Sequence, residues 1–259
     1  MRFASLGSGS QGNALIVEAG STRILLDCGF GPGEVSARIS RLGLEAGDLD
    51  AIIVTHEHGD HGGGVVKLSA SHDIPVYLTR GTYSGLGAEG RNLANKKFID
   101  ACTPFSIGAV EVTPYTVPHD AREPIQFVLS DGAVRLGVLT DTGQSTPHIV
   151  ESLSGVHALV LECNHDPDML RSGPYPAWLK DRIAGRLGHL ANAEAAEIVA
   201  AMDCSRLQHV IAAHLSEKNN TPGLARAALA GALNCATDWI DVATQDEGFA
   251  WREIRPRSA

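Results

Sequence analysis

Three histidines and an aspartate stand within the six-residue segment His56-Glu57-His58-Gly59-Asp60-His61. The apolar run 51–55 that precedes this segment is typical of a buried strand. Side chains spaced so closely can converge on one point only if the chain bends sharply, and Gly59 permits such a bend. Imidazole nitrogens and carboxylate oxygens are preferred ligands of zinc and its transition-metal neighbours. The segment therefore predicts a metal site with His56, His58, Asp60 and His61 as ligands.

Three more potential ligands stand where other apolar, strand-like runs end. They are His119 after residues 110–118, Asp141 after residues 134–140, and His214 after residues 210–213. Strand ends that meet at one edge of a sheet bring their side chains together, as they do in open α/β sheets. We therefore predict that these three side chains join the first four as metal ligands.

Seven ligands are too many for one tetrahedral ion, and they suit two ions about 3.5 Å apart. We predict two groups of three ligands with Asp141 bridging between them: His56, His58 and His119 in one group, and Asp60, His61 and His214 in the other. A water shared by the two ions would lose a proton near neutral pH and act as a hydroxide nucleophile. Zinc is the expected ion for a histidine-rich set, with manganese or iron as alternatives.

The elements that must position these ligands fall into two similar halves. The first half is predicted to contain strands at 2–6, 14–18, 23–27, 51–55 and 76–78, with helices at 32–42 and 62–71. The second half is predicted to contain strands at 110–117, 125–130, 133–140, 158–162, 209–213, 239–242 and 249–253, with helices beginning at Pro147 and at 193–202 and 224–233. Asp131-Gly132, between two apolar runs, predicts a hairpin. This order predicts an α/β fold with two sheets face to face and helices outside, a four-layer αββα sandwich formed by one domain over residues 1–259.

Composition narrows the class of protein. The chain has 259 residues, of which 44% are hydrophobic, and a net charge of −9. No apolar stretch reaches the roughly 20 residues needed to cross a bilayer, so no membrane partner is expected. Five scattered cysteines form neither a CxxC pair nor a disulfide framework, which suits a reducing cytoplasm. The charge disfavours broad binding to nucleic acid but allows a local basic channel, for which Arg171, Lys180, Arg182 and Arg186 are candidates.

The ligand set closely resembles that of the metallo-β-lactamase fold superfamily, over essentially the whole chain. The superfamily's HxHxDH motif matches the segment that begins at His56, and its later His, Asp and His match His119, Asp141 and His214. Within the superfamily the chain is similar to the YycJ/WalJ-like branch of metallo-hydrolases, in the segments 5–13, 162–170, 175–180, 188–190 and 214–220. The resemblance implies a dinuclear metal-dependent phosphodiesterase, specifically a nuclease with 5′-to-3′ exonuclease activity. It further implies single-stranded DNA or RNA, or another phosphodiester, as substrate.

Other functions are possible for the same ligands. Thioester hydrolases of the glyoxalase II type and lactonases form one alternative class, although the sequences around His189 and Ser216 are unlike theirs. A metal-binding regulatory or scaffold protein without turnover is another possible class. The presence of all seven ligands argues against it. Hydrolysis of β-lactams is not expected, because β-lactamases of this fold do not use a bridging carboxylate of the Asp141 type.

Two histidines outside the ligand set are candidates for catalysis. His189 and His165 could contact a phosphate or protonate a leaving oxygen. We predict both as catalytic residues, together with Asp60 of the metal segment, and His189 also as a contact of the substrate.

Polar residues near the ligands are candidates for substrate binding or support. The glycine-rich loop 7–13 could present backbone N–H groups to an anion, which makes Ser8 and Ser10 predicted substrate contacts. Ser216, beside His214, is a third. Asp27, at the end of a strand, is expected either to support the ligand loop or to cap a turn.

Overall fold

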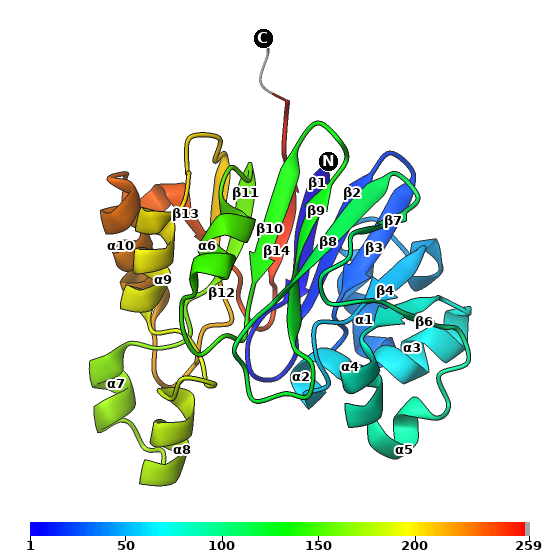
Figure 1. Ribbon diagram of the computed structural model, residues 1–259, viewed down its shortest axis with the longest axis horizontal. Helices are drawn as coiled ribbons and strands as arrows, with labels where there is room; N and C mark the ends of the chain where they lie inside the picture. Colours follow the sequence, from blue (N-terminus) through cyan, green and yellow to red (C-terminus); the bar gives the residue numbers. More distant parts are fainter. Residues whose placement is uncertain (257–259) are drawn as a thin grey trace.

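The computed structural model describes residues 1–256, and its framework is two seven-stranded sheets that face each other (Figure 1). The first sheet has the order β14-β1-β2-β3-β4-β5-β6 and the second has the order β13-β12-β11-β10-β9-β8-β7. The strands of the first sheet are β1 (Arg2–Gly7), β2 (Ala14–Ala19), β3 (Thr22–Leu26), β4 (Ala51–Ile53), β5 (Val76–Leu78), β6 (Lys96–Phe98) and β14 (Phe249–Glu253). Those of the second are β7 (Phe105–Ile107), β8 (Val110–Thr116), β9 (Ile125–Ser130), β10 (Arg135–Leu139), β11 (Ala158–Glu162), β12 (His209–Ala213) and β13 (Ile240–Val242).

Each half of the chain begins with antiparallel strands and ends with parallel ones. In the first half, β1, β2 and β3 pair antiparallel, and β3 to β6 pair parallel. In the second half, β7 to β10 pair antiparallel, and β10 to β13 pair parallel. The last strand, β14, returns to pair with β1. The parallel strands of both sheets need crossover connections, and these carry the helices.

Helices cover the outer face of each sheet, one group on either side of the molecule (Figure 1). The first half contains α1 (Pro32–Ser40), α2 (Gly59–Gly62), α3 (Val65–His72), α4 (Arg80–Gly85), α5 (Gly87–Gly90) and the 3₁₀ turn η1 (Ala46–Asp48). The second half contains α6 (Pro147–Leu153), α7 (Pro167–Ser172), α8 (Ala177–Ile183), α9 (Asn192–Ala201), α10 (Pro222–Leu233) and the 3₁₀ turn η2 (Thr237–Trp239). None of the helices within residues 1–256 is long and apolar enough to cross a bilayer.

Alternation along the strands divides the apolar side chains among three layers of core. On β2, Leu15 and Val17 point into the core between the two sheets, whereas Ile16 packs in the core beneath α1 and α3. On the second sheet, Leu161 and its outward-facing neighbours form a third core with α6, α9 and α10. Because both faces of each sheet are covered, the strands are apolar on both faces. The predicted four-layer αββα sandwich is confirmed, and the last three residues of the predicted domain 1–259 lie outside the described part.

The structure adds short elements that the sequence pattern does not indicate. Strands β6 and β7 have three residues each, too few for alternation to predict a strand, and β6 has no buried residue. Helices α7 and α8 occupy the connection between β11 and α9. Helix α8 has no buried residue, and its apolar face is limited to Leu179 and Ile183. The predicted hairpin between β9 and β10 is present, with Gly132 at a φ of 87°.

Candidate metal centre

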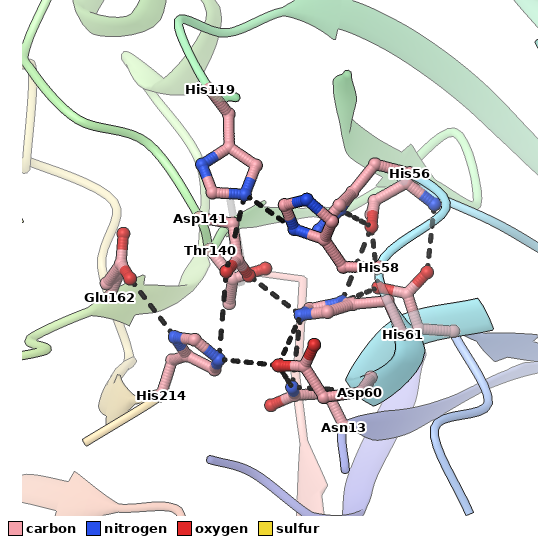
Figure 2. A network of polar contacts seen from close by, with 12 residues as sticks. Asn13, His56, His58, Asp60, His61, His119, Thr140, Asp141, Glu162 and His214 are labelled. Carbon is pink, nitrogen blue, oxygen red and sulfur yellow. Dashed lines mark hydrogen bonds and ion pairs between the residues drawn. The ribbon is translucent and has the colours of Figure 1, made fainter. Parts of the chain in front are cut away.

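The seven predicted ligands come together at one edge of the sandwich, where strands from both sheets end (Figure 2). The segment after β4 supplies four of them, and the segments after β8, β10 and β12 supply one each. Two groups form, each with donor atoms within 4.8 Å of one another: His56, His58 and His119 in one, and Asp60, His61, Asp141 and His214 in the other. These groups have the same membership as the two predicted from the sequence, with Asp141 in the second.

Asp141 lies between the two groups. Its Oδ2 is 2.9 Å from Nε2 of His61, and its Oδ1 is 3.7 Å from Nε2 of His214. The same Oδ1 is 3.9 Å from Nε2 of His119, which belongs to the other group. Asp141 is 2% exposed. A buried carboxylate whose oxygens lie near nitrogens of both groups is suited to bridge two cations.

Four of the five histidines are fixed by contacts on the ring nitrogen Nδ1. Carboxylates accept from two of them, Asp27 from His61 at 2.8 Å and Glu162 from His214 at 3.1 Å. Nδ1 of His119 donates to the Gly188 carbonyl oxygen at 3.1 Å, and Nδ1 of His56 lies 2.9 Å from the Thr55 hydroxyl. With Nδ1 occupied, each ring turns Nε2 toward the centre. Such outer contacts are a regular feature of metal-binding histidines, since they fix the orientation of the ring.

The donor atoms at the centre fit a metal better than they fit one another. Nε2 of His56 is buried and has no hydrogen-bond partner among the described residues. Nε2 of His119 lies 3.1 Å from Nδ1 of His58, so ring nitrogens of both histidines point toward the same place. Buried polar atoms in folded proteins are almost always satisfied. An imidazole and carboxylate set of this kind satisfies divalent transition-metal ions.

The electrostatics of the centre give His56 and Asp141 the protonation states that metal binding needs. His61 and His214 differ, because burial lowers the pKa of each imidazole but Asp141 and further carboxylates outweigh it and raise that pKa. Burial, with a smaller contribution from His61, lowers the pKa of His56 well below its ordinary value, so its ring is neutral. Burial alone would raise the pKa of Asp141, but His214 and His61 outweigh it and hold that pKa well below its ordinary value. A neutral imidazole and an ionised carboxylate are the forms in which these side chains bind metal.

Three residues of the centre have backbone in the left-handed region. Asp27, Asp141 and His214 have φ values of 60°, 54° and 54°. Each follows a strand directly or closely, and the left-handed turn bends the chain so that the side chain points into the site. Such backbone costs of order 1–3 kcal/mol per residue and persists where surrounding contacts over-determine it. Asp27 shows what those contacts are, because it accepts from Thr55 N, Thr55 Oγ1 and His61 Nδ1, each at 2.8 Å.

Glu162 is a central residue of the site that the sequence analysis did not identify. It is fully buried at the end of β11, and its Oε1 accepts from Nδ1 of His189 at 2.8 Å and from Nδ1 of His214 at 3.1 Å. Its Oε2 accepts from the backbone N–H groups of Thr142 and Leu190. The sequence does contain an indication, because Glu162 ends an apolar run in the same way as the predicted ligands. Together with Asp141, His189 and His214 it forms a third group of potential donor atoms.

The centre opens into a cleft of about 330 Å³. The predicted residues that line it outside the ligand set are Ser10, His189 and Ser216, and Tyr175 and Arg182 line it as well. The side chain of Arg182 is 55% exposed and pairs with Asp120 at 2.7 Å. The cleft therefore combines the donor atoms of the centre with hydroxyl groups, an imidazole and a guanidinium group.

Two predicted residues lie outside this cleft. Ser8 is buried, and its hydroxyl donates to Asn13 Oδ1 at 3.1 Å and accepts from the backbone N–H of His214 at 2.9 Å. It thus joins the glycine-rich loop to a predicted ligand. His165 lines a different cavity, on the far side of α8. Asn164 lines the cleft, and the side chain of the next residue in this extended segment, His165, points to the opposite side.

Comparisons with known proteins agree with this architecture. Residues 22–214 match the family described as "Beta-lactamase superfamily domain". The exodeoxyribonuclease YycJ of Bacillus anthracis is 34% identical over 235 residues, which cover 90% of this chain and 89% of that protein. The exodeoxyribonuclease WalJ of Streptococcus pneumoniae is 30% identical over 238 residues, which cover 90% of this chain and 88% of that protein. The metallo-beta-lactamase fold protein YhfI from Bacillus subtilis has the same fold, with a TM-score of 0.72, 18% identity and coverage of 97% and 99%.

The chain belongs to the β-lactamase superfamily, and within it to the YycJ/WalJ-like proteins. The predicted resemblance is therefore confirmed. Since the chain also carries His and Asp groups able to hold metal, the predicted class of metal-dependent, nuclease-like hydrolase is confirmed with it.

Proposed function

We propose that this chain is a two-metal exonuclease that removes nucleotides from the 5′ end of single-stranded DNA or RNA. The observation that carries the proposal is the meeting of two ligand groups at Asp141 in a chain that follows two exodeoxyribonucleases over 90% of its length. The exposed guanidinium of Arg182 at the cleft gives a phosphodiester backbone a cation, although the whole chain is acidic.

Two divalent ions are proposed as cofactors. His56, His58 and His119 would hold one, Asp60, His61 and His214 would hold the other, and Asp141 would reach both. Zinc is the first choice because imidazoles predominate in the set, and manganese or iron are the alternatives. Ions bound there would supply Lewis-acid activation of water and of phosphoryl oxygens.

His189 is the proposed proton donor to the leaving oxygen. Because its Nδ1 is engaged by Glu162 at 2.8 Å, its Nε2 is the ring nitrogen left for the cleft. Burial lowers the pKa of His189, but the charge of Glu162 outweighs burial and raises that pKa above its ordinary value. The raised pKa favours the protonated imidazole, which can donate a proton when the P–O bond breaks.

The remaining predicted residues take supporting roles in this proposal. Ser10 and Ser216 line the cleft and are proposed to contact the substrate. Asp60, whose side chain is 23% exposed, contacts Nε2 of His214 at 3.4 Å and is proposed to complete the second ligand group. Ser8 is proposed to act through His214, whose backbone it holds, and not by direct contact with the substrate.

The decisive experiment is degradation of a 5′-phosphorylated, 3′-labelled single-stranded DNA and of its RNA counterpart, in Mn²⁺ and in Zn²⁺. Stepwise shortening from the 5′ end by the wild-type protein, abolished in Asp141→Ala, is the expected result. If neither strand is cleaved while two metal ions are bound per chain, the nuclease proposal is wrong. Thioesters and lactones then become the substrates to assay.

We also propose that the protein acts in the cytoplasm. All five of its cysteines are free, and Cys28 and Cys163 are buried. Unpaired cysteines of this kind are usual in a reducing compartment. Fractionation of cells that produce a tagged protein would test this, and recovery outside the cytoplasmic fraction would contradict it.

A further inference from the structure

Helix α8 separates the cleft of the metal centre from a second cavity of about 360 Å³. Leu179, Arg182 and Ile183 line the cleft region on one face of the helix. The residues on the opposite face, spaced i, i+3, i+4, i+7, line the second cavity: Ala177, Lys180, Asp181 and Ala184. Residues of the α7 region, including Pro167 and Leu170, form its other wall. This volume is within the range of small-molecule sites.

His165 contributes a buried polar group to the cavity. The side chain is 3% exposed, and its Nδ1 has no hydrogen-bond partner within residues 1–256. A buried polar group without a partner costs stability. A ligand in the cavity supplies the missing hydrogen bond if the side chains that cover Nδ1 move aside. His165 also forms a β-bridge with Ala191, so its backbone is held firmly in this position.

The charge state of His165 defines the chemistry of that ligand. Burial lowers the pKa of His165 to about 4, so the ring is neutral at physiological pH. A neutral imidazole offers one donor and one acceptor. It is therefore suited to a polar but uncharged partner, such as the edge of a heterocyclic base. The apolar side chains of Pro167, Leu170 and Ala184 provide walls for the faces of such a ring.

Charged groups at the rim complete the pattern. Lys180 and Arg171 line the cavity together with one acid, Asp181. Arg171 already pairs with Asp168 at 2.7 Å, whereas Nζ of Lys180 donates to the backbone oxygen of Arg171 and has further donors to offer. An apolar cavity with a neutral imidazole inside and a cation at the rim matches a base that carries a phosphate.

We propose that this cavity is a nucleotide subsite, in which His165 binds the edge of the base and Lys180 binds the phosphate. The identity of the ligand rests on the proposed nuclease function. Asn164 lines the cleft while the adjacent His165 lines the cavity, so residues 164–165 and α8 stand between the subsite and the site of cleavage. Its occupant is either a released nucleoside monophosphate or a nucleotide that is still part of the strand.

The first experiment is calorimetric titration of the metal-loaded protein with 2′-deoxyadenosine 5′-monophosphate. Ala184→Phe places a ring in the cavity from an exposed position and should abolish this binding. His165→Leu should weaken it about 5- to 10-fold, the value of one hydrogen bond. Ala200→Phe, at an exposed alanine of α9, is the matched control and should leave the affinity unchanged.

The second experiment separates the two sources of the nucleotide. The KM of single-stranded oligonucleotides of increasing length is measured for the wild type and for Ala184→Phe. If Ala184→Phe raises the KM of the longer strands and the wild type does not bind the free nucleotide, the subsite is assigned to a nucleotide within the strand. Binding of the free nucleotide, with KM unchanged, assigns it to the released product. If Ala184→Phe and His165→Leu alter neither quantity, the proposal is wrong.

Thermal unfolding separates a ligand-binding histidine from a structural one. Since Nδ1 of His165 lacks a hydrogen-bond partner within residues 1–256, His165→Leu should unfold at the same temperature as the wild type or higher. A lower unfolding temperature with unchanged nucleotide affinity would overturn the proposal. The nuclease function and the subsite can fail independently. A protein that cleaves no strand but binds the nucleotide in a way that Ala184→Phe abolishes would retain the subsite alone.

Discussion

The metal centre and the α7–α8 segment border the same cleft but are built in opposite ways. The ligands at the centre are mostly buried, and Nδ1 of four histidines is already engaged by the protein. Helix α8 has no buried residue, its Trp178 is 66% exposed, and a cavity lies behind it. The lower part of Figure 1 shows α7 and α8 projecting from the body of the sandwich.

This difference suggests a division of labour. Groups that carry out chemistry must be held in place before the substrate arrives, and strand ends with outer hydrogen bonds achieve that. Groups that receive a long, flexible substrate gain from surfaces that can adjust. We therefore expect substitutions at the centre to affect turnover, and those on α8 to affect substrate affinity.

The largest effect is expected from Asp141→Asn, which keeps the shape of the side chain but removes its charge. Both ligand groups lose their shared carboxylate, so metal content and turnover should fall together, turnover by more than about 100-fold, beyond what loss of an outer contact produces. Mass spectrometry measures the metal content, and the 5′-exonuclease assay measures the turnover. Asp238→Asn, at an exposed aspartate, is the control. Full metal content and activity in Asp141→Asn would place the bridging role elsewhere.

Glu162→Gln should have the next largest effect. The amide is nearly isosteric but cannot hold His189 and His214 as a charged acceptor, so activity should fall about 10- to 100-fold. Burial opposes the charged form of Glu162, but His189 and His214 lower its pKa, so the wild-type residue is ionised. Loss of that charge lowers the pKa of His189. If His189 acts as the acid, the alkaline limb of the pH–rate profile therefore moves to lower pH. The control Glu197→Gln, on the exposed face of α9, should change neither the activity nor the pH–rate profile.

Removal of metal should affect the two regions unequally. Ligand binding to the folded state stabilises it by about 2.7 kcal/mol at a 100-fold excess over Kd, which corresponds to several degrees in Tm. Chelation should therefore lower Tm and increase amide hydrogen exchange at residues 56–64. Exchange at residues 173–187 should change little, because α8 supplies no ligand. A uniform increase over both segments would contradict the contrast between them.

The sequence was sufficient to predict which side chains meet at the candidate metal centre, because the pattern that marks them is local. The spacing from His56 to His61 and the polar residues that end strand-like runs at His119, Asp141 and His214 are visible in one dimension. Glu162 was missed because a single glutamate at a strand end has many structural uses. Its role appears only when His189 and His214, 27 and 52 residues away in the chain, meet its carboxylate.

The α7–α8 segment was harder to predict for a different reason. Helix α8 buries no residue, and Leu179 and Ile183 give it only a short apolar face, too little to predict a helix. The cavity behind it is lined by residues as far apart in the chain as His165 and Ala184, which no local pattern brings together. Asn164 faces the cleft and His165 faces away because the backbone between them is extended. Which of the two faces the cleft depends on the position of β11 in the sheet, which the sequence does not give.

The smallest effect on stability is expected from Trp178→Ala on α8. Its side chain is 66% exposed, and surface substitutions away from special contacts usually change the free energy of unfolding by less than about 0.5 kcal/mol. Trp178 lies one helical turn before Arg182, which lines the cleft. If the cleft receives single-stranded DNA, as proposed, the exposed indole can stack on a base, and one such contact is worth about 1–3 kcal/mol. The KM for single-stranded DNA should therefore rise while kcat and Tm remain near their wild-type values. A fall in kcat with KM unchanged would instead assign Trp178 to the chemistry of the centre, and would remove the division between the two regions.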